Sequence, residues 1–151
     1  MTDIFNKILG VLLAFTLLAG APLVINTMGK DLTMNRSVLN EMTNLIDKVT
    51  DKGTLTEDDM TDFYLGISSY GVTMDATVQR YIKVVNPDGA GGTYTTYMLS
   101  DQAVGSRWNK GDVIKVTVKA VDYTSSQRIQ YRLLHLTPAK FDQTLSGMIR
   151  K

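Results

Sequence analysis

The sequence predicts an α+β protein in which a long N-terminal helix, hydrophobic at first and then amphipathic, packs on a small antiparallel β-sheet. Two distributions along the chain lead to this prediction. No charged side chain occurs among the 22 residues between Lys7 and Lys30, whereas 29 of the 31 charged side chains lie from Lys30 onward. After Gly71 the apolar residues change from helical spacing to the alternation that is typical of strands. We therefore expect residues 1–30 to form a helix for a membrane or a protein core, and residues 31–151 to form a head domain in water.

The apolar segment is long enough to cross a bilayer. Residues 8–25 contain no charged side chain, Asn or Gln, and at ~1.5 Å per residue this run and its flanks cover roughly 30 Å of hydrocarbon. A cleavable secretory signal is the competing interpretation, because Ala19-Gly20-Ala21 has the small-x-small pattern of a cleavage site. Pro22 directly follows that pattern and is expected to block cleavage, so a retained anchor is favoured. The same proline predicts a kink or local melting of the helix over residues 20–23.

Two amphipathic helical segments are predicted after the apolar run. Residues 33–49 carry apolar side chains at helical spacing, and no proline separates them from the apolar run, so one long helix ending at Gly53 is expected. A second helix is predicted to begin after a cap at Thr56 and to end at Gly71. The apolar positions that define these faces are Val38, Met42, Leu45, Val49, Phe63 and Ile67.

The rest of the chain predicts an antiparallel meander of about four strands with one face in water. In the third strand Ile114, Val116, Val118 and Ala120 alternate with Lys115, Thr117 and Lys119, which places the two lysines together on the wet face. Thr137-Pro138 is expected to start a short C-terminal helix. Trp108 and the seven tyrosines are expected in the core of the sheet rather than on a binding surface. The strands are predicted at residues 76–85, 93–99, 113–121 and 127–136, with a hairpin tip at 88–92.

The side chains that most catalytic and metal sites require are scarce. The chain has no Cys and one His, His135, which falls inside the predicted strand 127–136, so neither a catalytic triad nor a zinc site is expected. Four acids at Glu57, Asp58, Asp59 and Asp62 lack the spacing of a calcium loop and are interpreted as a helix N-terminus. The basic residues form no stripe and no aromatic stacking motif, so nucleic acid is not an expected partner. We therefore expect a protein that is not an enzyme and that has no cofactor.

The charges are divided unevenly along the head domain. Residues 31–75 carry nine acidic and three basic side chains, whereas residues 76–151 carry eleven basic and five acidic ones. The two halves either neutralise each other within one molecule or meet between neighbouring subunits, where complementary potentials set the register. For the second interpretation the expected inter-subunit residues are Glu57, Asp58 and Asp59 on the acidic side and Lys115 and Lys119 on the basic side.

The order of these features resembles that of type IV pilin-like proteins. An apolar helix with Pro22 near its twentieth position runs into an amphipathic helix and then a C-terminal sheet, and the stretch NEMTNLIDKVTDKGTLTEDDMTDF looks like that of Tad-type pseudopilins. The resemblance implies a subunit whose first helix waits in the membrane and then packs in the core of a helical filament, with the sheet domains outside. Such pilins usually carry Glu where this chain has Phe5, and Asp3 is the only nearby acid.

The sequence thus leads to a structural hypothesis with one alternative. The chain is expected to be a pilin-like subunit that is inserted in the cell membrane and then joins an extracellular homo-oligomeric filament with the help of assembly machinery. The alternative is a single-pass accessory protein of a secretion or conjugation system that does not polymerise. Asp3 is expected either to neutralise the amino terminus of a neighbouring subunit or to remain a solvated acid. The residues expected to mediate assembly are Asp3, Leu9, Leu12, Phe15, Leu18, Pro22 and Leu23.

Overall fold

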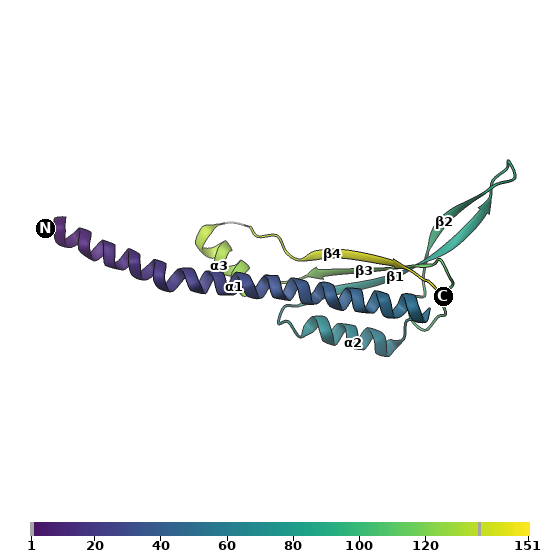
Figure 1. Cartoon of the computed structure of the whole chain (residues 1–151), viewed down its shortest axis with the longest axis horizontal. Coiled ribbons are helices and arrows are strands. Elements are labelled where there is room, and N and C mark those ends of the chain that lie inside the picture. Colours follow the sequence, from purple (N-terminus) through teal and green to yellow (C-terminus); the bar gives the residue numbers. More distant parts are fainter. Residues whose placement is uncertain (1, 136) are drawn as a thin grey trace. The chain divides into compact units, whose positions relative to one another are not determined.

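A computed structural model describes residues 2–135 and 137–151 and confirms the predicted α+β fold, with a long N-terminal helix and a four-stranded antiparallel sheet (Figure 1). The chain forms two compact units. The first comprises Met1–Met34 and Tyr123–Pro138, and the second comprises Asn35–Asp122 and Ala139–Lys151. In chain order the elements are α1 (Thr2–Lys52), α2 (Glu57–Ser68), β1 (Met74–Pro87), β2 (Thr93–Ser100), β3 (Val113–Ala120), α3 (Ser125–Leu134) and β4 (Asp142–Met148).

The strands are antiparallel, but their order is β2-β1-β3-β4, so the predicted meander is wrong. The length of β1 explains this order. Its residues from Met74 to Tyr81 pair with β3, whereas its residues from Arg80 to Pro87 pair with β2. Only Arg80 and Tyr81 therefore have strand partners on both sides, and the rest of the β1–β2 hairpin extends beyond β3.

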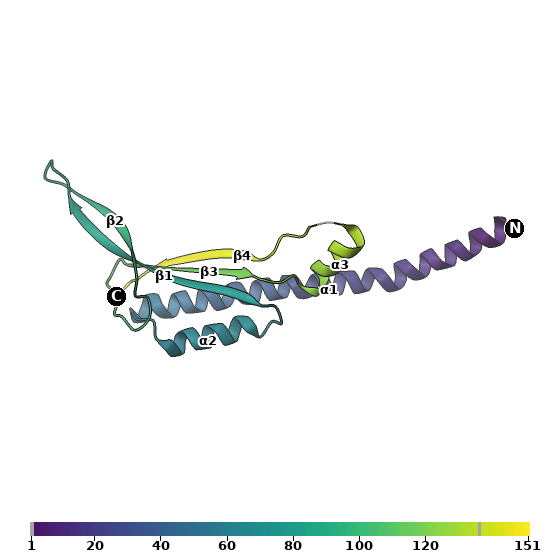
Figure 2. The ribbon, with the colours of Figure 1, turned by 180° about the vertical axis from the view of Figure 1, so that it is seen from behind.

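The core of the second unit lies between one face of the sheet and the helices. Figures 1 and 2 show the C-terminal part of α1 and the whole of α2 on the same side of β1, β3 and β4. The alternation predicted for β3 is confirmed, because the four side chains predicted on its apolar face are buried while Lys119 is exposed. The predicted apolar faces of both helices are also buried. The main core side chains are Val38, Met42, Leu45, Val49, Leu55, Phe63, Ile67, Ile114, Val116, Val118 and Ile149.

The predicted helix boundaries are largely confirmed. Gly53 ends α1 with φ +69°, and its N–H donates to the carbonyl of Val49 at 2.8 Å. Thr56 caps α2 in a reciprocal capping box with Asp59. This helix ends at Ser68, three residues before the predicted end at Gly71. Of the kink or local melting predicted over residues 20–23, the melting is wrong, because α1 continues through Pro22, whose ring removes only one donor from a long ladder of hydrogen bonds.

The last two predicted elements have the opposite secondary structure. Residues 127–134 of the predicted strand belong instead to α3, which begins at Ser125 because Thr124 and Gln127 make a second capping box; position 136 lies outside the described residues. His135 is the C-cap of this helix, with a left-handed φ of 53°, rather than a strand residue. The predicted C-terminal helix is instead the edge strand β4, whose backbone pairs with that of β3 from Asp142 to Met148.

The aromatic side chains divide between the core and the surface. Trp108 is buried as predicted, and its indole N–H donates to the carbonyl of Ala103 at 3.0 Å. The expectation that the tyrosines fill the core is wrong for Tyr64, Tyr94, Tyr97 and Tyr131, which are exposed.

Candidate assembly surface

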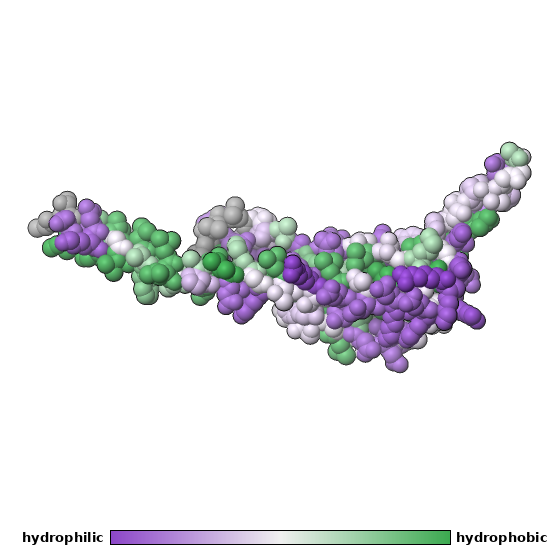
Figure 3. Space-filling model, viewed as in Figure 1, coloured by the Kyte–Doolittle hydropathy of each residue, from purple (hydrophilic) through white to green (hydrophobic). Residues whose placement is uncertain are grey.

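The N-terminal part of α1 presents large apolar side chains to the outside around its whole circumference. In the space-filling view it is mostly green, the colour of hydrophobic residues (Figure 3). This helix is long and apolar enough to cross a membrane, and its most apolar stretch is uncovered by the rest of the chain. The fifteen exposed side chains are Ile4, Phe5, Ile8, Leu9, Val11, Leu12, Leu13, Phe15, Leu17, Leu18, Leu23, Val24, Ile25, Met28 and Leu32.

The predicted assembly residues belong to this surface but do not form one stripe. Phe15 and Leu18 are the most exposed of them, at 72% and 78%. Each residue turns an α-helix by about 100°, so steps of three residues fall about 60° short of a full turn. The side chains of Leu9, Leu12, Phe15 and Leu18 therefore spread over about half of the circumference. Such a spread suits contacts with several neighbours or with lipid.

Two hydroxyl groups of this segment are satisfied within the helix. The Thr16 hydroxyl donates to the carbonyl of Leu12 at 2.8 Å, and the Thr27 hydroxyl donates to the carbonyl of Val24 at 2.9 Å. In hydrocarbon an unsatisfied hydroxyl would cost several kcal/mol, of the order of 4–8. A Cβ added at Gly10 or Gly20 would meet nothing within 4 Å, so these positions leave room for a close helix approach. The segment is therefore chemically suited to an apolar environment.

Asp3 lies exposed in the first turn of α1. A carboxylate at this position interacts favourably with the N-terminal end of the helix dipole. The structure contains one copy of the chain, so the predicted pairing of Asp3 with a neighbour's amino terminus stays a prediction.

Asp31 ties α3 to α1 within the first unit. Its Oδ2 atom accepts a hydrogen bond of 2.8 Å from the Thr124 hydroxyl and another from the Ser126 hydroxyl. Thr124 is also the N-cap of α3, so one side chain both starts the helix and anchors it. The sequence analysis missed this cluster because it assigned a strand here, although the Thr-x-x-Gln spacing from Thr124 to Gln127 is a recognisable capping signal.

Asp59 differs from the other predicted acidic residues because it is buried, with 4% of its surface exposed. Its carboxylate lies 2.5 Å from the ammonium of Lys48 and 3.7 Å from that of Lys52, so it connects α2 to α1. Burial alone would raise the pKa of Asp59, but its hydrogen bonds with Lys48 and Thr56 outweigh this effect and lower the pKa to about 2. Glu57 and Asp58 remain exposed and available to a neighbour.

Lys115 and Lys119 lie on the outer face of the sheet, opposite the side covered by the helices, as their alternation with buried residues requires. Lys119 forms an exposed ion pair of 3.2 Å with Asp142, and the Lys115 ammonium is 6.0 Å from the ring centroid of Tyr81. Neither lysine forms an ion pair with Glu57 or Asp58 among the described contacts. Docking of these groups between subunits stays a prediction.

Part of the charge asymmetry is neutralised inside the molecule. Arg150, from the basic C-terminal half, forms ion pairs of 3.6 Å with Asp47 and 3.1 Å with Asp51, both from the acidic half. All three side chains are exposed, so each pair contributes only ~0–1 kcal/mol.

A buried arginine–aspartate pair holds the loop before β3. The Arg80 guanidinium donates to Asp112 Oδ2 at 2.7 Å and 3.2 Å and to the Ser106 hydroxyl at 2.9 Å, and it stacks 5.3 Å from the Trp108 ring centroid. Burial raises the pKa of Asp112, but the hydrogen bonds from Asn109 and Arg80 outweigh it, so the net pKa is lowered. Sequence reasoning missed this pair. Arg80 occupies an inward position in the alternation of β1, and this signal predicts a buried carboxylate partner.

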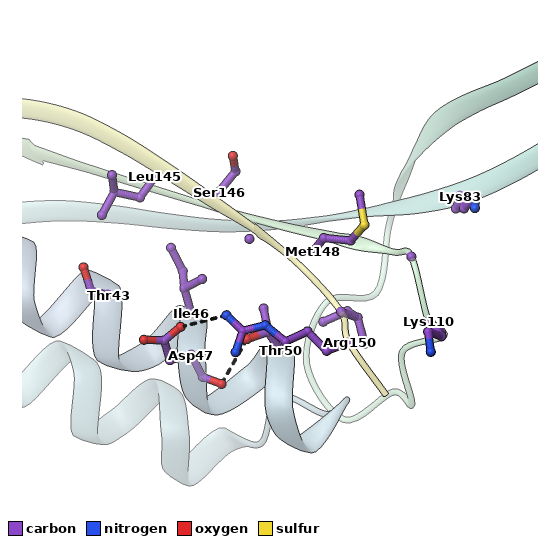
Figure 4. Close-up of a pocket in the computed structure, with 13 residues that line it drawn as sticks. Thr43, Ile46, Asp47, Thr50, Lys83, Lys110, Leu145, Ser146, Met148 and Arg150 are labelled. Atoms are coloured by element: carbon purple, nitrogen blue, oxygen red, sulfur yellow. Dashed lines mark hydrogen bonds and ion pairs between the residues drawn. The ribbon is translucent and has the colours of Figure 1, made fainter.

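A groove of about 910 Å³ opens along β4 in the second unit (Figure 4). Its apolar lining comes from Ile46 of α1 and from Leu145, Met148 and Ile149 at the C-terminal end of the chain. Lys83, Lys110, Arg150 and Asp47 supply its charged groups. Gly147 allows α1 to approach β4 closely, because a Cβ at this position would lie 2.4 Å from Ile46 Cγ2.

No metal-binding cluster accompanies these surfaces in the part of the chain that the structure describes. There, no three His, Asp or Glu side chains come together as a metal site. Comparison with protein-family models, with curated proteins and with solved structures found no match.

Proposed function

We propose that the chain is a pilin-like structural subunit of an extracellular helical filament, and that it polymerises through the N-terminal part of α1. The observation that carries this proposal is the uncovered set of fifteen large apolar side chains between Ile4 and Leu32. Full burial of one such side chain contributes roughly 1.5–3 kcal/mol. A bilayer can cover this surface before assembly, and the same segments of neighbouring subunits can cover it in a filament.

Two further features support a role in assembly. The second unit has its own buried core, formed by α2, the sheet and the residues of α1 after Met34, so its folding does not need the apolar segment. The apolar segment satisfies its own hydroxyl groups and contains small residues, which permit close packing against other helices. Anchoring and assembly are therefore separable from the fold of the sheet domain.

The second candidate function is that of a single-pass anchored accessory protein that remains a monomer. The observation that favours it is the exposure of apolar side chains on all sides of α1, because lipid contacts a lone membrane helix from every direction. The two candidates agree about the membrane and differ in whether the helix leaves it.

The test compares membrane insertion with filament formation in full-length protein expressed in cells that assemble it. Phe15→Ala combined with Leu18→Ala keeps the segment apolar but removes contact area, so membrane levels should be unchanged while filament yield falls at least tenfold. The matched control is Leu65→Ala on α2, whose side chain is 66% exposed but lies outside the apolar segment. Sheared cell-surface fractions examined by electron microscopy give the filament yield.

Thread-like particles in the wild-type fraction, lost in the double variant and kept in the control, are the expected result. Monomers in detergent extracts and no threads from wild-type cells would instead assign the anchored accessory role.

A further inference from the structure

The β1–β2 hairpin forms an arm that has no covering layer. Residues 82–87 and 93–98 pair only with each other, because β3 pairs with β1 no further than Tyr81. An isolated two-stranded hairpin is at best marginally stable in water. Large apolar side chains on both faces of this arm are nevertheless exposed, namely Val85, Tyr94, Tyr97 and Met98. Figure 1 shows the arm extending away from α2 and from the β3–β4 part of the sheet.

The outer edge of the arm lacks the features that normally protect an edge strand. Natural edge strands are blunted by charged side chains, proline, bulges or short length. β2 is eight residues long, its sequence TYTTYMLS contains no charge, proline or glycine, and seven of its residues are exposed. Its unpaired backbone edge is therefore open to another strand.

The other edge of the same sheet is β4, and the groove described above opens beside it. β4 pairs with β3 on one side only. Leu145 points to the helix-facing side of the sheet, where the groove lies between β4 and Ile46 of α1. In β2 the side chains of alternate residues point to this same side, because their β1 partners share the face of Arg80 and Ile114; they are Tyr94, Thr96, Met98 and Ser100.

Strand direction and charge are complementary between the two edges. Since all neighbours in the sheet are antiparallel, β2 and β4 run in opposite directions, and a β2 strand placed beside β4 would continue the antiparallel pattern. Residues 84–100 carry a single charge, that of Asp88. The groove is lined by the cationic side chains of Lys83, Lys110 and Arg150; Lys83 belongs to the base of the arm of the same copy, and Arg150 is paired with Asp47 and Asp51. The uncharged strand β2 and the acidic tip at Asp88 match a groove that has an apolar lining and carries the ammonium groups of Lys83 and Lys110.

We propose that the arm of one copy of this chain adds to the β4 edge of a second copy, with Tyr94 and Met98 seated in the groove beside Ile46 and Leu145. The arm of one molecule does not fill its own groove, because two strands separate β2 from β4 and the edges are roughly 14 Å apart at ~4.8 Å per strand. Each copy gives an arm at one edge and receives one at the other. Such a heterologous contact repeats from copy to copy, and it builds an open filament when the rotation between copies does not close a ring.

This inference rests on the proposed function, since a filament supplies the repeated neighbours. The absence of native cysteine makes disulfide trapping the direct test. One copy carries Thr95→Cys on β2 and another, with a different tag, carries Ser146→Cys on β4; both positions lie on the outer face of the sheet. Two further variants, Thr93→Cys on β2 and Gln143→Cys on β4, test other registers of the β2–β4 pairing and both faces of the sheet. A bond within one molecule is excluded, because a disulfide requires a Cα–Cα separation below ~7 Å.

The expected result, with full-length proteins co-expressed in assembling cells, is a disulfide that joins the two tags and is absent when either variant is expressed alone. Met98→Lys in the arm-giving copy should lower the yield of this species at least fivefold. Leu65→Lys is the matched control, because the two side chains are similarly exposed, at 61% and 66%, and Leu65 lies on α2. Thr117→Cys on the central strand β3 should not cross-link to Thr95→Cys.

Other outcomes overturn the proposal. Disulfides between two Thr95→Cys copies alone would show symmetric pairing of β2 with β2, and trapping of a chain of different mass would show another partner. If filaments form but no β2–β4 disulfide is found at any scanned position, the arm contact is rejected and the proposed function is unaffected. A β2–β4 disulfide in cells that form no filament would support the arm contact and reject the filament.

Discussion

At the scale of single residues, the most informative side chain is Asp59. It connects two helices through the Lys48 ion pair, and it accepts a hydrogen bond of 3.1 Å from the backbone N–H of Thr56. Its folded-state pKa of about 2 lies below its ordinary value of 3.8. The ionised form is therefore favoured by the fold, and its contribution to stability is present above about pH 4 and is lost as the pH falls towards 2.

We expect Asp59→Asn to lower the free energy of unfolding by about 2 kcal/mol at pH 7, since one pKa unit corresponds to about 1.36 kcal/mol. Between pH 4 and 2 the variant should lose less stability than the wild type, because the titrating group is gone. Denaturant unfolding of the full chain in detergent, followed by the fluorescence of the single Trp108, measures both effects. Asp58→Asn, at an exposed position, is the control and should have little effect on the free energy of unfolding. If the free energy of unfolding falls equally between pH 4 and 2 for Asp59→Asn and the wild type, Asp59 is not the titrating group.

At the scale of elements, the stability of α3 depends on the cap at its N-terminus. Thr124 caps the helix by accepting from the N–H of Gln127 at 3.2 Å, and it donates to Asp31 of α1. Loss of an N-cap typically costs about 1 kcal/mol. This polar cluster therefore both starts α3 and joins it to α1 within the first unit.

Thr124→Ala is expected to accelerate amide hydrogen exchange in α3 by roughly fivefold, the equivalent of about 1 kcal/mol, and to leave exchange in β3 unchanged. Thr124→Ser retains the hydroxyl and should behave like the wild type. Exchange measured by mass spectrometry on the full chain separates these outcomes. Equal acceleration in α3 and β3 would mean that the cap supports the whole molecule rather than this helix.

At the scale of the whole molecule, charge is expected to organise the outer layer of the assembly. Glu57 and Asp58 open α2, whereas Lys115 and Lys119 lie on the opposite side of the sheet, so the two groups can meet between copies. A single exposed pair contributes only ~0–1 kcal/mol, but a contact repeated in every subunit adds up along a filament. The screening length falls from ~10 Å at 0.1 M salt to ~3 Å at 1 M, so high salt should loosen the sheet domains while the apolar helices stay packed.

We expect Lys115→Glu combined with Lys119→Glu to lower assembly at low salt, because like charges would then face each other. Adding Glu57→Lys and Asp58→Lys should restore part of the yield, and filament yield at 0.1 M and 1 M salt measures both effects. Lys140→Glu is the control for a change of net charge elsewhere. Equal assembly by all variants at low salt would show that the charge asymmetry is neutralised within the monomer. Arg150 already neutralises Asp47 and Asp51 in this way.

Several features of the fold follow from signals that lie within one segment. Three such signals can be recognised from neighbouring residues alone, because helices repeat every 3.6 residues and strands every two. They are the apolar run at residues 8–25, the cap at Thr56 and the alternation from Ile114 to Ala120. The helix–strand order up to residue 120 could therefore be predicted. The helix of residues 125–134 also has a local signal, the capping spacing from Thr124 to Gln127, although a strand is predicted for residues 127–136.

The sequence by itself determined the long apolar helix, its amphipathic continuation and the existence of an antiparallel sheet. Only the tertiary structure decided the strand order, the pairing of β4 with β3, the burial of Asp59 and Arg80, and the groove beside the open edge of β4. The physical reason is that each of these depends on partners far apart in the chain. Arg80 meets Asp112 across 32 residues, and Asp31 meets Thr124 across 93. Local periodicity selects which face of an element is apolar, but which element covers that face is decided by competition among all the surfaces of the folded chain.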